Sequence, residues 1–68
     1  MRIDRVKLIA EMARRDIHTQ ELADKAGVSR SAVQSMRSGK SVWENTAVHV
    51  AKALGVDVTE LLEDRKEA

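Results

Sequence analysis

The 68-residue chain contains no cysteine, so neither a disulfide bond nor a thiolate metal site can stabilise it. It also lacks proline and tyrosine, and its only aromatic residue is Trp43. A chain of this length is close to the lower limit for a single hydrophobic core without cross-links. Because alanine, leucine, valine, glutamate, lysine and arginine are abundant instead, we expect one all-α domain over residues 1–68.

Several classes of protein are disfavoured by what the sequence does not contain. No apolar run is long enough to cross a membrane and no targeting segment precedes the domain, so a cytoplasmic location is the simplest expectation. His18 and His49 lack a third ligand and lie too far apart for a helical metal pair, so we expect no metal or cofactor. No serine has a histidine at a spacing that would activate it, so we do not expect an enzyme.

The net charge of +1 hides an uneven distribution along the chain. Residues 1–40 hold nine basic and five acidic side chains, a net charge of +4, whereas residues 41–68 hold three basic and six acidic ones, a net charge of −3. Binding to a polyanion depends on local potential rather than on total charge. The first half of the chain is therefore the better candidate for a surface that binds a polyanion.

Hydrophobic spacing predicts five helices. Apolar residues that repeat at helical spacing mark a first helix over about residues 4–15; they are Val6, Ile9, Ala10 and Ala13, with Leu8 and Met12 beside them. Further helices are expected over 19–26 and 30–38, then a fourth that ends at Gly55 and a short fifth that includes Leu61 and Leu62. The segment Ser41 to Glu44 reads as a capping box that begins the fourth helix, and Asp57 to Glu60 as a second that begins the fifth. The charged tail, residues 63–68, is expected to fray.

Residues Leu22 to Gly39 have the spacing of a DNA-reading helix-turn-helix, and the whole motif is expected over about residues 19–38. Gly27 follows a helical pattern at a point where a left-handed backbone favours glycine, and Ser29 can accept hydrogen bonds from the free N–H groups of the next helix. Val33 and Met36 give that helix one buried stripe. The opposite face is wholly polar, and consists of Arg30, Ser31, Gln34, Ser35 and Arg37.

These residues resemble the Cro and phage-repressor type of helix-turn-helix, the XRE family, and the resemblance covers nearly the whole chain. It rests on Leu8 to Ala10, Thr19 to Ala23, Ala26 to Ser29, Ser38 to Lys40 and Thr46 to Val56. The resemblance implies a compact, lambda-repressor-like five-helix bundle. Three departures are visible: the usual Thr-Gln pair falls on His18 and Thr19, the usual Pro-Ser reads Val42-Trp43, and Asp16 replaces a usual glycine.

The resemblance also implies which side chains meet DNA, because the third helix of this family lies in the major groove. By position the base contacts would be Arg30, Ser31, Gln34 and Ser35. Arg30 is the leading candidate, since its planar fork can donate two hydrogen bonds to guanine. The phosphate contacts would be Thr19, Arg37, Ser38, Lys40 and Trp43.

Each of these assignments has a structural alternative. The polar face is otherwise a solvated surface, and Arg37 can instead pair with an acid. Arg14 and Arg15 suit the C-terminal end of the first helix, and we favour that structural role for them. For Trp43 we favour a partly buried anchor of its loop.

The sequence therefore indicates a DNA-binding transcriptional regulator that acts on double-stranded DNA, with repression as the expected mode. The alternative is a protein-interaction module, antitoxin-like or an anti-regulator, for which DNA is secondary. One recognition helix reads only a few base pairs, so we expect a homodimer on a palindromic site, formed on DNA if not before. Its interface would use apolar residues at the end of the chain, namely Val56, Val58, Leu61 and Leu62, although these can equally close the core of the monomer.

Overall fold

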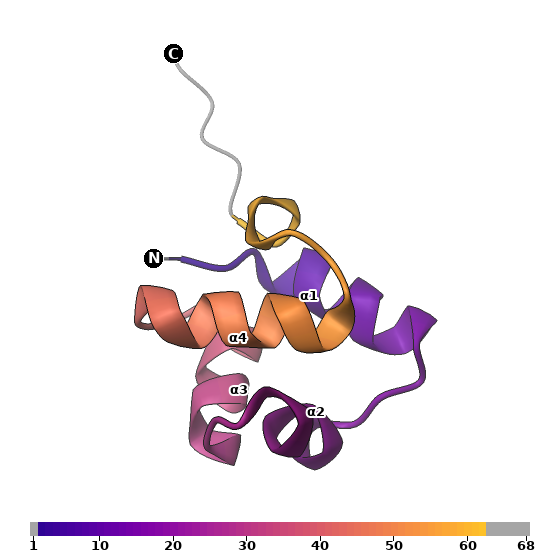
Figure 1. Cartoon of the computed structure of the whole chain (residues 1–68). Helices are drawn as coiled ribbons and strands as arrows, with labels where there is room; N and C mark the ends of the chain where they lie inside the picture. Colours follow the sequence, from indigo (N-terminus) through magenta and orange to yellow (C-terminus); the bar gives the residue numbers. More distant parts are fainter. Residues whose placement is uncertain (1, 63–68) are drawn as a thin grey trace.

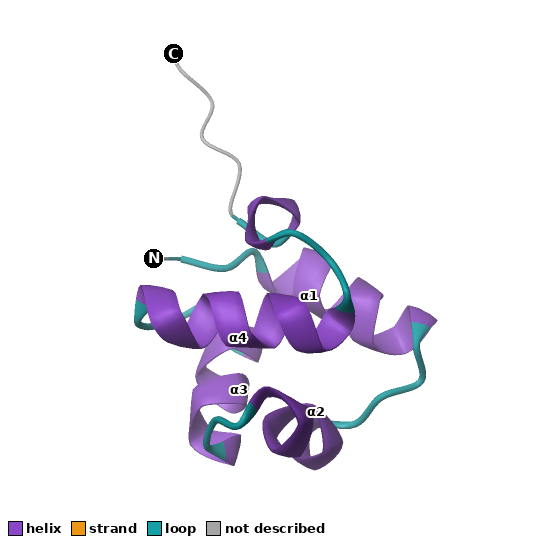
Figure 2. Ribbon diagram, in the orientation of Figure 1, coloured by secondary structure: helices purple, strands orange, loops and turns teal. Residues whose placement is uncertain are grey.

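The computed structural model describes residues 2–62, and most of these are helical (Figures 1 and 2). The helices are α1 (Arg5–Arg14), α2 (Thr19–Ala26), α3 (Arg30–Arg37), α4 (Glu44–Leu54) and a short 3-10 helix, η1 (Val58–Glu60). Over residues 2–62 the only β pairing consists of two isolated bridges. The prediction of an all-α domain is confirmed, but with four α-helices rather than five. The charged tail lies outside the described residues.

One small core joins the four α-helices. α2 packs against α3 and α4, and α1 packs against α3. Each α-helix contributes at least one fully buried side chain to this core, among them Leu8, Leu22, Met36 and Val50. Burial of a side chain of this size contributes about 1.5–3 kcal/mol, so a chain without cross-links depends on every one of them.

The buried face of α1 differs from the predicted one. Leu8 and Met12 are buried, four residues apart on one face of the helix. Val6 is 64% exposed, and Ala10 and Ala13 are also exposed. Most of the apolar residues that mark this helix in the sequence therefore face solvent. The side chains that face the core are Leu8 and Met12, which lie beside them.

The predicted capping box at Ser41 is wrong, and the reason is a pairing with the N-terminal segment. The backbone of Ser41 forms an antiparallel bridge with Arg2, which keeps the chain extended up to Trp43. The N-cap of α4 is therefore Trp43, whose side chain makes no capping hydrogen bond, and Glu44 is the first helical residue. A carboxylate in this first turn is favoured by the helix dipole.

The predicted fifth helix is shortened by the same N-terminal segment. The capping box is present: Asp57 accepts from the N–H of Thr59, and the side chain of Glu60 accepts from the N–H of Asp57. Beyond Glu60, however, the carbonyl of Leu61 accepts from the N–H of Asp4 (2.8 Å). Leu62 forms a bridge with Ile3 and its carbonyl accepts from Lys7 Nζ (3.1 Å). Leu61 and Leu62 thus contact the N-terminal segment and α1, and η1 ends at Glu60.

Candidate nucleic-acid interface

The turn between α2 and α3 has the geometry that the sequence predicts. Gly27 adopts φ 70°, a left-handed conformation that is unstrained only for glycine, and Val28 donates its N–H to the carbonyl of Ala23 (3.0 Å). Ser29 Oγ accepts from the N–H of Ala32 (3.1 Å) and so caps the start of α3. This local network fixes the angle at which α3 leaves α2.

α3 has two sharply different faces. Val33 and Met36 are fully buried in the core. On the outer side Arg30, Ser31 and Gln34 are exposed and Ser35 is half-buried, so the four predicted base contacts lie on the accessible side of one short helix. Arg30 is the first residue of α3, a position where the helix dipole disfavours a cation, so helix stability does not explain its presence.

The loop that follows α3 is held by backbone hydrogen bonds to its last turn. The N–H of Ser38 donates to the carbonyl of Gln34 (3.0 Å), and the N–H of Lys40 donates to that of Ser35 (2.9 Å). Gly39 between them has φ 84°. The side chains of Ser38 and Lys40 are exposed, so two of the predicted phosphate contacts project from a loop with a fixed backbone.

Thr19 and Arg37, two further predicted phosphate contacts, bind one another. Arg37 Nη1 donates to Thr19 Oγ1 over 2.6 Å and links the C-terminal end of α3 to the start of α2. Thr19 is only 9% exposed, so its hydroxyl is less accessible than the prediction implies. The alternative expected from the sequence is an ion pair between Arg37 and an acidic side chain. Within residues 2–62 Arg37 binds the hydroxyl of Thr19 instead.

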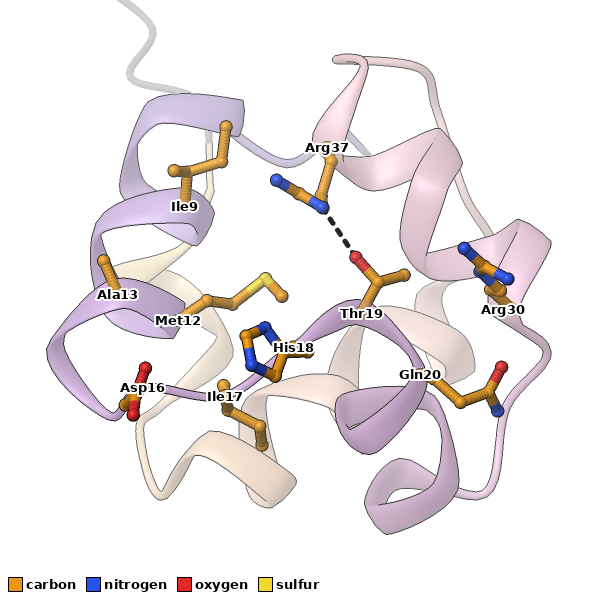
Figure 3. Close-up of a pocket in the computed structure, with 10 residues that line it drawn as sticks. All are labelled: Ile9, Met12, Ala13, Asp16, Ile17, His18, Thr19, Gln20, Arg30 and Arg37. Carbon is orange, nitrogen blue, oxygen red and sulfur yellow. Dashed lines mark hydrogen bonds between the residues drawn. The ribbon is translucent and has the colours of Figure 1, made fainter.

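A groove of about 540 Å³ lies between α1 and this pair (Figure 3). Its apolar wall is formed by α1 and the start of the next loop, where Ile9, Met12, Ala13 and Ile17 lie. The polar side carries Asp16, His18, Thr19, Gln20, Arg30 and Arg37. Figure 3 shows Arg37 and Thr19 joined by their hydrogen bond on the side of the groove opposite Ile9 and Ala13. With two arginines and one acid, the lining is suited to an anionic ligand such as a phosphate.

Trp43 is not the partly buried anchor that the sequence favours. It is 85% exposed, since the extended chain before α4 directs it away from the core. An indole in this position is available to pack against a partner or to donate its N–H. Because the indole is exposed, its contact with the DNA backbone stays a prediction.

Arg14 and Arg15 both contact Glu11 on α1, as the favoured structural role implies. Arg14 forms an ion pair with Glu11 (3.6 Å), and Arg15 pairs with the same carboxylate while also donating to the carbonyl of Glu11 (3.3 Å). His49 is exposed, as expected. His18 occupies the N-cap of α2, but its side chain makes no capping hydrogen bond.

Two polar residues near these side chains are not among the predicted contacts. Gln20 is exposed in the groove, and its Nε2 donates to Asp24 (3.0 Å). Arg5, the first residue of α1, lies against Gly39. No local signal in the sequence points to Arg5, because that proximity joins segments more than thirty residues apart.

The described part of the chain carries neither a membrane span nor a metal site. None of the helices within 2–62 is long and apolar enough to cross a membrane. The same residues contain no group of three or more His, Cys, Asp or Glu side chains that could hold a metal ion.

Several solved structures resemble this arrangement of helices, whereas no curated protein matches the chain. A point mutant of hydroxyethylphosphonate dioxygenase is similar, with a TM-score of 0.84 and 28% identity over 98% of this chain. Native PhpD with cadmium atoms, and PhpD with cadmium and hydroethylphosphonate, each give a TM-score of 0.81 and 28% identity. The chain spans only 15% of the length of each of these proteins.

The family itself is identified by a sequence model of the Cro/C1-type HTH DNA-binding domain, which matches residues 7–67. This range includes α2, the turn at Gly27 and α3. The chain therefore belongs to the family of Cro/C1-type helix-turn-helix DNA-binding domains.

Proposed function

We propose that this protein is a sequence-specific transcriptional regulator that reads the major groove of double-stranded DNA with α3. The observation that carries the proposal is the division of α3 into a fully buried apolar face and an accessible polar face headed by Arg30. A short helix of this kind fits the major groove, where arginine can donate two hydrogen bonds to guanine. Repression is the proposed mode, because a small domain bound at a promoter blocks other proteins from the same DNA.

The cations around α3 support this proposal. Arg30 and Lys40 form no side-chain hydrogen bond or ion pair within residues 2–62, so both can meet phosphates or bases without losing an internal partner. Arg37 is already oriented by Thr19. A DNA duplex presents one negative charge per about 1.7 Å of helix axis, so cations held at fixed positions contribute to binding of any sequence.

A protein-interaction module is the second candidate. It is favoured by one observation: the side chain of Trp43 is 85% exposed. Exposed tryptophan is typical of the central residues of protein interfaces. In this case the helical surface would bind a protein, and DNA binding would be weak or absent.

A mobility shift with a pool of duplex fragments at about 50 mM and about 200 mM salt separates the two candidates. A DNA-binding regulator with several phosphate contacts should retain fragments at low salt and lose affinity steeply as salt rises. Lys52→Gln, which removes an exposed charge from α4, is the matched control for charge alone. If the protein retained no DNA at either salt concentration, or retained it equally at both, the protein-interaction module would be favoured.

We further propose that two copies bind a palindromic site, with recognition helices about 34 Å apart. The predicted interface now has fewer candidates, because Leu61 is fully buried in the core. Val56, Val58 and Leu62 are half-buried against it and remain available. Since these three offer little free surface, dimerisation on DNA rather than in solution is the simpler expectation.

Sedimentation with and without a bound duplex tests the dimer. Leu62→Glu should keep the fold and reduce binding of the second copy, whereas Leu61→Glu should unfold the monomer and serves as the contrast. If a folded Leu62→Glu variant bound the duplex as two copies with the affinity of wild type, Leu62 would not be part of the interface. Strict one-to-one binding to an asymmetric site would contradict the dimer.

A further inference from the structure

The N-terminal segment is attached to the loop that follows the recognition helix. Arg2 pairs with Ser41 through the backbone, and Arg2 Nη2 donates to the carbonyl of Gly39 (3.2 Å). The side chain of Arg5 also lies against Gly39, with Cδ 3.8 Å from the position that a Cβ there would take. Two arginines from the start of the chain therefore sit beside the loop that carries Lys40.

The charged side chains beside this loop differ in whether they have hydrogen-bond partners. Within residues 2–62, neither the guanidinium of Arg5 nor the ammonium of Lys40 forms a hydrogen bond or an ion pair. The acid beside them, Asp4, uses its Oδ1 to accept from the backbone N–H groups of Val6 (2.9 Å) and Lys7 (3.3 Å). A hollow of about 260 Å³ lies between the N-terminal segment and the loop, and it is lined by residues 2–6, Ser38 and Gly39.

Helix stability does not account for the cation at position 5. Arg5 is the first residue of α1, where the helix dipole favours an acidic side chain, and the first turn of α1 contains no acid. The capping function is already performed by Asp4. What Arg5 adds is an exposed positive charge beside the C-terminal end of α3.

We propose that Arg5 and Lys40 together bind a phosphate of the DNA backbone that flanks the base pairs read by α3, with Arg2 holding the loop in place. This inference rests on the proposed function. The guanidinium of Arg5, whose side chain lies against Gly39, and the ammonium of the next residue, Lys40, supply several N–H donors to phosphate oxygens without any sequence preference. The N-terminal segment would then extend the footprint of the protein beyond the helix-turn-helix.

The test compares Arg5→Gln with Lys52→Gln, which removes the positive charge of another exposed side chain, on α4. The equilibrium affinity for a selected duplex and for an unrelated duplex is measured between about 50 and about 200 mM salt. For Arg5→Gln we expect a slope of log Kobs against log salt that is shallower by about 0.9, the value for one lost phosphate contact. Both duplexes should be weakened by the same factor, and the selected consensus should not change.

Phosphate ethylation interference adds a readout of position. Wild-type protein should be inhibited by ethylation of one phosphate outside the specific base pairs, and Arg5→Gln should lose sensitivity at that phosphate alone. If wild-type protein binds with sequence preference while Arg5→Gln matches Lys52→Gln in slope and interference pattern, the role of Arg5 is refuted and the proposed function stands. If wild-type protein shows no salt-dependent DNA binding, both proposals fail together. Circular dichroism confirms that each variant is folded.

Discussion

Arg37 donates a hydrogen bond of 2.6 Å to the hydroxyl of Thr19, and this contact joins the C-terminal end of α3 to the first turn of α2. The two residues are eighteen positions apart. The contact complements the turn at Gly27, which fixes the helices at their other ends. The orientation of α3 is thus determined at two separated points.

The first prediction concerns this pair. In a double-mutant cycle with Thr19→Val and Arg37→Gln, the coupling energy from urea unfolding should be about 1 kcal/mol, since a charged donor here meets a mostly buried hydroxyl. Arg14→Gln with Thr19→Val provides a control pair without contact. Additive effects of Thr19→Val and Arg37→Gln would show that the hydrogen bond contributes nothing in solution.

The second prediction concerns Trp43. Because its side chain is 85% exposed, Trp43→Ala should change the free energy of unfolding by less than about 0.5 kcal/mol, whereas Val50→Ala should destabilise the core markedly. As the only aromatic residue, Trp43 also reports directly on binding. Its fluorescence should be that of a solvated indole in the free protein and should change when a duplex is added. If Trp43→Ala were strongly destabilised, Trp43 would anchor its loop, as the sequence alone suggests.

The third prediction concerns the turn of the motif. Gly27 has φ 70°, and no neighbouring atom lies within 4 Å of the position that a Cβ there would take, so any penalty for substitution comes from the backbone alone. Gly27→Val should cost roughly 1 kcal/mol or more, and Gly27→Asn should cost less because asparagine tolerates this conformation. Thermal unfolding measures the difference. Equal melting temperatures for the two variants would contradict a purely conformational penalty.

The fourth prediction is a dependence on pH at η1. The backbone N–H and the hydroxyl of Thr59 both donate to Asp57 and lower its pKa below the ordinary value of 3.8, although desolvation acts in the opposite direction. A depressed pKa stabilises the folded state above pH 3.8, and this contribution is lost as the pH falls through the folded-state pKa. Asp57→Ala should therefore melt earlier than wild type at neutral pH, and the gap should close in strong acid.

Thr59→Val provides a graded control, since it removes the hydroxyl donor and keeps the backbone one. Its melting temperature at neutral pH should lie between those of wild type and Asp57→Ala. A gap that stays constant as the pH falls well below 3.8 would mean that the capping carboxylate is not the source of the stability.

Local signals in the sequence are sufficient for the helix-turn-helix. The bounds of α2, the left-handed Gly27 and the cap at Ser29 each depend on neighbouring residues, and all three are confirmed. Asp16, where a glycine is usual, adopts a positive φ of 51° as its position in the family pattern implies.

The predictions from the sequence that are wrong concern places where segments distant in the sequence pair with each other. Ser41 resembles a cap in its local pattern, but its pairing with Arg2 spans almost forty residues. The local pattern leaves open whether Leu61 lies in a dimer interface or in the core of the monomer, because its hydrogen bond with Asp4, far away in the sequence, is not visible in that pattern. For the same reason the contact of Arg5 with Gly39, and the bond from Arg37 to Thr19, cannot be predicted from the spacing of residues.

Selection of bound sequences from a random duplex pool, with wild-type protein and Arg30→Ala in parallel, tests the central claim most directly. Wild type should enrich a defined, two-fold symmetric site. Arg30→Ala should relax the preference at one base pair of each half-site and weaken specific binding by about 1–3 kcal/mol, because a bidentate base contact is lost. Lys40→Ala should weaken all sequences alike and leave the consensus intact. No enrichment by wild type, or an unchanged consensus for Arg30→Ala, would contradict base reading by α3.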